Sequence, residues 1–106
     1  MQIELLWWQG CPSTEKAFSE LRGALADVGL QDEEPKLREI ETDEQAQAEG
    51  FRGSPTILID GVDRLEAGDG EPVGLSCRIY RRRDGGIAPT PDPADLRDAL
   101  REALAR

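Results

Sequence analysis

Cys11 is the residue whose type and position could do chemistry. It lies where an apolar run meets a glycine and an amphipathic stretch begins, in the segment Trp7-Trp8-Gln9-Gly10-Cys11-Pro12-Ser13-Thr14. We expect Pro12 at the first position of a helix, because it has no N–H to satisfy there and its φ is already helical. The N–H groups and the dipole of that helix favour the thiolate of Cys11, which is the nucleophilic and metal-binding form. The alternative is that Cys11 is a small apolar residue that caps a turn.

The composition excludes several other kinds of active site. The chain has no histidine, which removes Cys-His pairs, Ser-His-Asp triads and histidine metal sites. Its net charge of −9 opposes binding to a nucleic-acid backbone. One acidic stretch could indicate calcium, but its spacing is not that of an EF-hand loop, and we interpret it as a solvated loop and predict no metal site. Its residues are Asp60, Asp63, Glu66, Asp69 and Glu71.

The length and the apolar pattern predict one domain over residues 1–106. A chain of this size buries roughly two-thirds of its unfolded surface without disulfides or structural metal. The N-terminus enters patterned sequence at once, without a basic leader, and no apolar stretch is long enough to span a bilayer. We therefore expect a cytoplasmic protein that binds no membrane. The two cysteines fit one working thiol, with Cys77 in a second role, better than a disulfide staple.

The first half of the chain alternates between strand and helix patterns. Residues 2–8 predict a central strand, since apolar side chains fill both faces towards its end. From 12 to 30 apolar residues recur at spacings of three and four, which predicts a helix capped by Gly29. Charged side chains make 36–41 an edge strand. A brief helix follows, with a capping box and a closing glycine at Thr42, Gln45 and Gly50.

The second half predicts two more strands and a final helix. Residues 56–60 form a buried β-branched strand, and 61–74 is too long and too acidic for a tight hairpin loop, so we interpret it as a surface excursion. Alternation over 75–80 predicts a strand whose core face holds Leu75, Cys77 and Ile79. The last helix begins at Asp92-Pro93, and its apolar face holds Leu96, Ala99, Leu100, Ala103 and Leu104.

The element order is therefore strand, helix, strand, helix, strand, strand, helix. The first βαβ unit requires a parallel crossover, and the last two strands most economically pair antiparallel. We predict an α/β fold with a four-stranded mixed sheet and helices on both of its faces.

A second motif, together with this order, resembles the thioredoxin superfamily. The stretch Gly50-Phe51-Arg52-Gly53-Ser54-Pro55-Thr56-Ile57-Leu58-Ile59 is similar to the thioredoxin segment that leads into its third core strand. The resemblance implies a thioredoxin fold in which the Ser54-Pro55 peptide is cis and lies opposite the reactive cysteine. It also implies that the backbone of Ser54 pairs with a peptide or thiol ligand.

The active-site segment resembles the same family with one departure. Trp7 and Cys11 match the tryptophan and the first cysteine of the thioredoxin motif, but Thr14 stands where the second, resolving cysteine would be. The pattern is closer to that of a monothiol glutaredoxin, and it implies glutathione as a co-substrate rather than a resident cofactor. We assign Cys11 and Thr14 to catalysis, and we expect Trp8 and Pro12 beside the substrate.

The fold implied by this resemblance also places two later features. The fourth strand would run towards Cys11, so that Arg81 and its neighbours Arg82 and Arg83 lie near the thiol or hold an anionic ligand, although a charge run is more often a solvated loop. Cys77 would lie several residues away along that strand. A disulfide requires Cα atoms within about 7 Å, so we predict no Cys11–Cys77 bridge and interpret Cys77 as an inert core thiol.

Three functions are compatible with these residues. The first is a thiol-disulfide oxidoreductase, in which Cys11 attacks a small or protein disulfide, Ser54 and Pro55 position it, and a small thiol resolves the product. The second is a soft-metal or organomercurial-binding protein that uses Cys11 and Cys77, because the Gly-Cys-Pro and Leu-Ser-Cys-Arg segments look similar to small bacterial proteins labelled alkylmercury lyase-like. The third is a non-catalytic thioredoxin-fold binding module.

Overall fold

A four-stranded mixed sheet forms the centre of the molecule. The computed structural model describes residues 1–65, 74–75 and 79–105. The sheet has the order β2-β1-β3-β4, in which β1 pairs parallel with β2 and antiparallel with β3, and β3 pairs antiparallel with β4. The strands are β1 (Ile3–Trp7), β2 (Lys36–Glu39), β3 (Thr56–Ile59) and β4 (Val62–Asp63). The predicted α/β chain with a mixed sheet, a central first strand and an edge second strand is confirmed.

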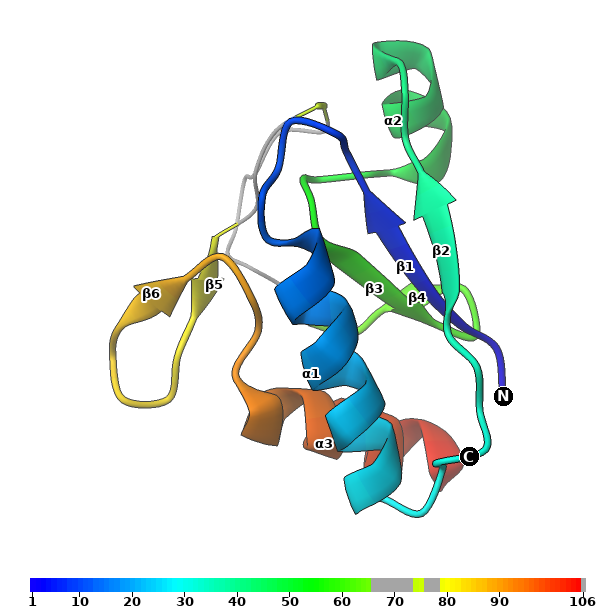
Figure 1. Ribbon diagram of the computed structural model, residues 1–106, viewed down its shortest axis with the longest axis vertical. Helices are drawn as coiled ribbons and strands as arrows, with labels where there is room; N and C mark the ends of the chain where they lie inside the picture. The colour runs from blue at the N-terminus through cyan, green and yellow to red at the C-terminus, as the bar shows by residue number, and fades with distance from the viewer. Residues whose placement is uncertain (66–73, 76–78, 106) are drawn as a thin grey trace.

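Three helices cover the two faces of this sheet: α1 (Thr14–Asp27), α2 (Asp43–Glu49) and α3 (Pro93–Leu104). In Figure 1, α1 and α3 lie next to each other, and α2 lies apart from both, beyond the arrowheads of β1 and β2. Because successive side chains of a strand point to opposite faces, Leu5 packs in the core with α1 and α3, whereas Leu6 packs with Ala46 of α2. Within the described residues, no helix has the length and apolar character needed to cross a membrane.

The caps predicted for α2 and α3 are present. The Thr42 side chain accepts a hydrogen bond from the Gln45 N–H at 3.1 Å, and Gly50 ends α2 with a φ of 66°. The Asp92 carboxylate accepts from the Ala94 N–H at 2.9 Å and begins α3. One expected core position of α3 is wrong: Leu104, the last residue of that helix, is 47% exposed.

The prediction that the chain leaves the sheet after β3 is wrong. A two-residue turn at Asp60 and Gly61, with φ of 52° and 81°, sends the chain straight back as β4. Positive φ at both central residues twists a hairpin in the same sense as its strands, and an Asp-Gly pair favours this turn. Among the residues that the structure describes, the fourth strand of the sheet is therefore Val62–Asp63.

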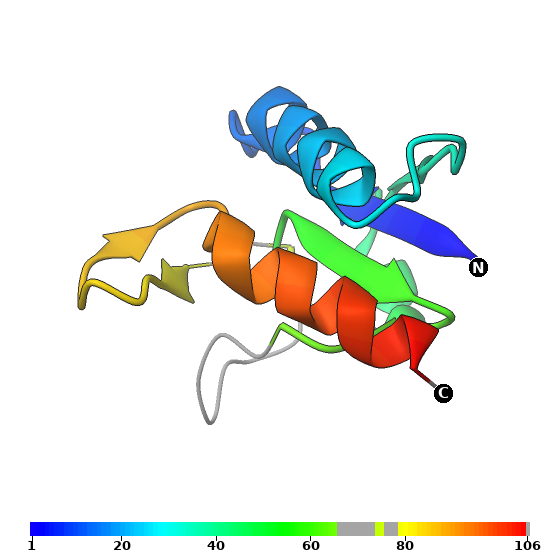
Figure 2. The same ribbon diagram turned by 90° about the horizontal axis from the view of Figure 1, so that it is seen from below.

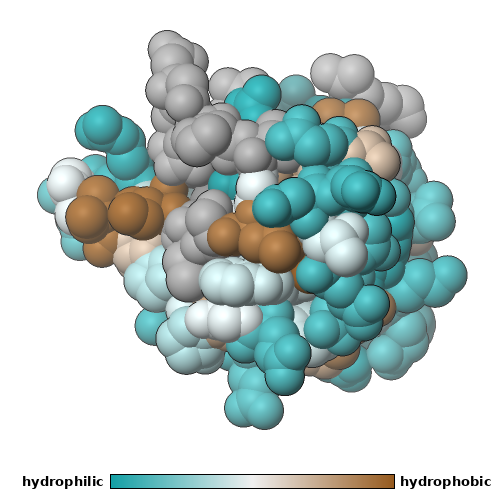
Figure 3. Space-filling view, turned by 90° about the horizontal axis from the view of Figure 1, so that it is seen from above, coloured by the Kyte–Doolittle hydropathy of each residue, from teal (hydrophilic) through white to brown (hydrophobic). Residues whose placement is uncertain are grey.

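The predicted strand over 75–80 is replaced, in its described part, by a short ribbon outside the main sheet. Strands β5 (Tyr80–Arg81) and β6 (Ile87–Ala88) pair antiparallel in a sheet of their own, which projects from the side of the molecule in Figures 1 and 2. The predicted phase is also wrong, because Tyr80 is 3% exposed and Ile79 is 50% exposed. Apolar side chains gather on the surface over this ribbon in Figure 3, and Ile87 is 69% exposed.

Candidate functional site

The turn before β3 contains the backbone feature that the resemblance implies. The Ser54-Pro55 peptide bond is cis, and Gly53 has a φ of 129°. Residues 53–56 are all buried, and Ser54 is 0% exposed. A buried backbone needs internal hydrogen-bond partners, so the donors around this turn define the site.

Each of the three successive carbonyl groups of residues 53–55 accepts a hydrogen bond from a side chain. The Thr56 hydroxyl donates to the first carbonyl at 2.6 Å, the Cys11 thiol donates to the second at 3.3 Å, and the Tyr80 phenol donates to the third at 2.5 Å. Cys11 comes from the β1–α1 connection and Tyr80 from β5, so segments far apart in sequence meet at the turn. The Ser54-Pro55 bond is cis, as the resemblance implies, and the Cys11 thiol contacts the carbonyl of that same peptide bond.

Cys11 lies ahead of α1 rather than in its first turn. The helix begins at Thr14, with Ser13 as its N-cap, and the Cys11 N–H instead donates to the Trp8 carbonyl at 3.0 Å. The prediction that Pro12 is the first helical residue is therefore wrong; it lies in the exposed turn before the cap. Because helix-dipole effects decline within about one turn, the hydrogen bond to the 53–55 turn is the more direct influence on the thiol.

The Trp8 ring lies against the backbone at Gly10. A Cβ atom at position 10 would lie 2.4 Å from the end of the Trp8 ring, so only glycine fits while the ring keeps this place. Trp8 is half-buried and also packs against the core cluster that contains Phe51. The Cys11 side chain is 6% exposed, so the thiol has little contact with solvent in this conformation.

Two hydroxyl groups in the segments that carry the thiol site have unused hydrogen-bonding capacity. Within the described part of the chain, the Thr14 Oγ1 and Ser54 Oγ atoms are buried and have no hydrogen-bond partner. Buried polar atoms without partners are uncommon in folded proteins. Thr14, predicted to be catalytic, therefore offers a donor at the start of α1, and Ser54 offers one in the turn.

Two of the three consecutive arginines bind groups other than Cys11. Arg83 binds the Asp95 and Asp98 carboxylates of α3, and Arg82 donates to the Thr90 hydroxyl at 3.4 Å. Arg81 is exposed on β5, and among the described residues it makes no ion pair. The expectation that this charge run supports the thiol is not met by any contact of the described side chains.

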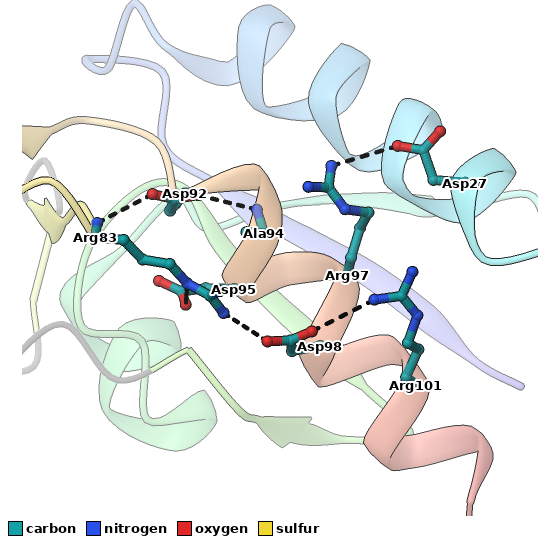
Figure 4. Close-up of polar contacts among 8 residues, drawn as sticks. All are labelled: Asp27, Arg83, Asp92, Ala94, Asp95, Arg97, Asp98 and Arg101. Carbon is teal, nitrogen blue, oxygen red and sulfur yellow. Dashed lines mark hydrogen bonds and ion pairs between the residues drawn. The ribbon is translucent and has the colours of Figure 1, made fainter.

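Arg83 instead attaches the ribbon to α3 through Asp95 and Asp98, as Figure 4 shows. The Arg83 N–H, followed by that of Ala94, donates to Asp92 and holds the pKa of that carboxyl below its ordinary value. The side chain of Arg83 likewise lowers the pKa of Asp98, and its bonds to Asp98 and Asp95 raise its own pKa. A charged hollow of about 290 Å³ lies beside this network, with Tyr80 and Arg81 among its lining residues.

Two features that the sequence singled out cannot be placed beside this site. Cys77, predicted to be an inert core thiol, and residues 66–73 of the acidic stretch lie outside the described residues. In the part that is described, no three His, Cys, Asp or Glu side chains form a group that could hold a metal ion.

Tyr80 is the site residue that the sequence did not reveal. The feature of the sequence that could have identified it is the general tendency of tyrosine to bury its ring while the hydroxyl group finds a hydrogen-bond partner. The alternation through Leu75 and Ile79 assigned it to the solvent face instead. Tyr80 is the chain's only tyrosine, so isotope-labelled tyrosine marks this residue alone.

The comparisons with known proteins add no relative to this description. No protein-family model, curated protein or solved structure matches the chain.

Proposed function

We propose that this protein is a thiol-disulfide oxidoreductase of thioredoxin-like fold that uses Cys11 as the single nucleophile of its site. The observation that carries the proposal is the hydrogen bond of 3.3 Å from the Cys11 thiol to the Ser54 carbonyl, beside a cis peptide bond to Pro55. This hydrogen bond holds the one described cysteine against a backbone acceptor. The hydroxyl oxygen of Thr14, at the start of the helix that follows Cys11, is also buried.

The reaction begins when the Cys11 thiol loses its proton to solvent. The thiolate attacks one sulfur of a disulfide, so that a bond forms between that sulfur and Cys11 and the substrate's S–S bond breaks. The second substrate sulfur leaves as a thiolate and takes up a proton. The product on the protein is a mixed disulfide at Cys11.

A second thiol completes the cycle, because Thr14 occupies the position of a resolving cysteine and cannot attack. The thiolate of a small thiol such as glutathione attacks the substrate sulfur of the mixed disulfide. A new disulfide forms between the small thiol and the substrate, and Cys11 leaves as a thiolate. Attack by a second small thiol on that product releases the remaining substrate thiolate, so the two electrons that reduce the original disulfide come from two small thiols, which end joined as a disulfide.

The backbone of the turn changes role during this reaction. In the resting protein the Ser54 carbonyl accepts from the thiol, but a thiolate or a mixed disulfide has no S–H to donate. The Ser54 carbonyl then becomes an acceptor for an N–H group of the substrate. Trp8 and the exposed Pro12 border the same thiol-bearing segment, and Arg81 follows Tyr80, which donates to Pro55.

The experiment that tests the proposal is capture of the mixed disulfide with oxidised glutathione, followed by intact-mass spectrometry. Wild type and Cys77→Ser should each gain one glutathione at residue 11, and reduced glutathione should release it. Cys11→Ser should gain none at that position. Absence of the adduct in wild type, with Cys11 still open to N-ethylmaleimide, would reject the oxidoreductase function.

A non-catalytic binding module is the second candidate, and the burial of the thiol favours it. Cys11 is 6% exposed and its S–H already has a backbone partner. For this function, Cys11→Ser should retain the fold and its ligand, because a hydroxyl can donate to the same carbonyl. Glutathione capture distinguishes the two candidates directly, since only the oxidoreductase requires a covalent intermediate.

A further inference from the structure

We propose that Tyr80 is a positioning residue for this exchange reaction, which holds the Ser54-Pro55 segment in place while the Cys11 thiol is consumed. The role rests on the proposed function and adds a residue that does not itself touch the reacting sulfur. Tyr80 is 3% exposed, and its phenol donates to the Pro55 carbonyl from a strand 25 positions further along the chain.

The Tyr80 hydroxyl is fixed through the ribbon that carries it. Next to β5, the Arg83 N–H donates to Asp92 at 3.0 Å, and the Arg83 side chain binds Asp95 at 2.7 Å and Asp98 at 2.5 Å (Figure 4). Helix α3 packs in the same core as α1, which begins at Thr14 beside the thiol segment. The ribbon, α3 and α1 therefore form one continuous support for the turn.

The three carbonyl contacts of the turn differ in what the reaction does to them. The carbonyl groups of residues 53 and 55 accept from the hydroxyl groups of Thr56 and Tyr80, and the reaction leaves these two hydroxyl groups unchanged. Only the Cys11 donor is lost when its sulfur becomes a thiolate or a disulfide. The flanking contacts then keep the Ser54 carbonyl directed at the sulfur, where a substrate N–H can replace the lost donor.

Removal of the Tyr80 hydroxyl should thus weaken the use of the Ser54 carbonyl without changing the sulfur itself. In a Cys77→Ser background, Tyr80→Phe should react about fivefold more slowly with oxidised glutathione, which has amide N–H groups, as expected from the loss of one hydrogen bond. Its rates with bis(2-hydroxyethyl) disulfide and N-ethylmaleimide, which have no N–H, should stay within about twofold. All three rates are measured as second-order constants by mass spectrometry.

Thr90→Val is the matched control. Thr90 is also buried, at 0% exposure, and its hydroxyl contacts Arg82 and Glu20 rather than the turn. This variant should keep all three rates of the parent. An unchanged glutathione rate in Tyr80→Phe, or an equal fall with all three reagents, overturns the positioning role. Parent protein that reacts with N-ethylmaleimide but with neither disulfide instead rejects the proposed function.

A measurement on the parent protein covers the case in which Tyr80→Phe does not fold. With ¹³C-labelled carbonyls, formation of the glutathione adduct should move the Ser54 carbonyl resonance and leave that of Pro55 in place. The hydroxyl proton of Tyr80, the only tyrosine, should remain protected from exchange. A Pro55 shift as large as that of Ser54 would show that the phenol does not hold the segment.

Discussion

At the scale of single residues, the position of the thiol depends on how closely the residues before it pack against one another. Cys11 reaches the turn because Trp8 and Gly10 fold the chain back, with the Cys11 N–H on the Trp8 carbonyl and the indole over the glycine. The positions that surround the thiol are thus set by fit as much as by chemical reactivity.

Gly10→Ala tests this fit. The added Cβ would lie 2.4 Å from the Trp8 ring, so the ring must move outward. We expect a loss of about 1 kcal/mol in the free energy of unfolding, at the lower end for overpacking because the ring's outer edge can shift. Tryptophan emission should also change as the indole moves. Urea titration followed by fluorescence measures both effects.

Gly23→Ala provides the control for Gly10→Ala. Gly23 lies inside α1, and no atom lies within 4 Å of its added Cβ. Since alanine is the better helix former, we expect this change to raise the free energy of unfolding by about 0.5–1 kcal/mol. Equal destabilisation by both substitutions would contradict the assignment of the Gly10 effect to Trp8.

Thr14→Val tests the second hydroxyl of the site. The Thr14 Oγ1 atom is buried without a partner among the described residues, so removal of its hydroxyl should cost little stability, and the thermal midpoint should stay within a few degrees. If the hydroxyl donates to the Cys11 thiolate during exchange, the glutathione rate should fall severalfold. Thr14→Ser should restore the rate, and a Val variant as fast as wild type would exclude this role.

At the scale of secondary-structure elements, α3 supports the site through its N-terminus. Asp92 caps the helix and also accepts from the Arg83 N–H, so one carboxylate joins α3 to the β5–β6 ribbon. The same ribbon delivers the Tyr80 hydroxyl to the turn before β3.

Asp92→Ala should therefore weaken two elements with one substitution. We expect the thermal midpoint to fall by several degrees, because loss of an N-cap destabilises a helix and the ribbon loses a contact. Amide hydrogen exchange should speed up at the start of α3 and in β5 before it does in β1. Asp92→Asn, which keeps a capping oxygen, should recover most of the midpoint, and exchange confined to α3 would contradict the link to the ribbon.

At the scale of the whole molecule, local patterns predicted the sheet's first three strands and all three helices. These elements have clear periodicity, and their caps at Thr42 and Asp92 are standard helix signals. The cis bond before Pro55 came from the family resemblance and not from the proline itself, since most X-Pro bonds are trans.

The parts that sequence did not predict depend on contacts between distant residues. The acidic residues after Asp60-Gly61 favoured the prediction of a surface loop over that of a hairpin, although two residues of β4 suffice to pair with β3. The inward direction of Tyr80 depends on an acceptor at Pro55, 25 positions earlier, that no local pattern contains. Likewise, the partners of Arg83 on α3 are known only once the fold is known.

The acid sensitivity of the molecule follows from this last network. Hydrogen bonds from Arg83 lower the pKa values of Asp92 and Asp98 in the folded state. A carboxyl whose pKa is lower in the folded than in the unfolded state stabilises the fold above its unfolded pKa, and this contribution disappears as pH falls through the folded value. Asp98 is exposed and Asp92 is only half-buried, so solvent and salt reduce the effect.

Arg83→Gln should accordingly remove part of the pH dependence. Between pH 5 and pH 3, the urea midpoint of wild type should fall more than that of the variant, and the two curves should converge at the acid end. The net charge of −9 at pH 7 falls to zero near the pI of about 4.4 and is positive below it, so self-repulsion first declines and then grows, but it does so in both proteins. The difference between their curves therefore isolates the Arg83 contacts. Parallel curves from pH 7 to pH 3 would show that these ion pairs do not join the ribbon to α3 in solution.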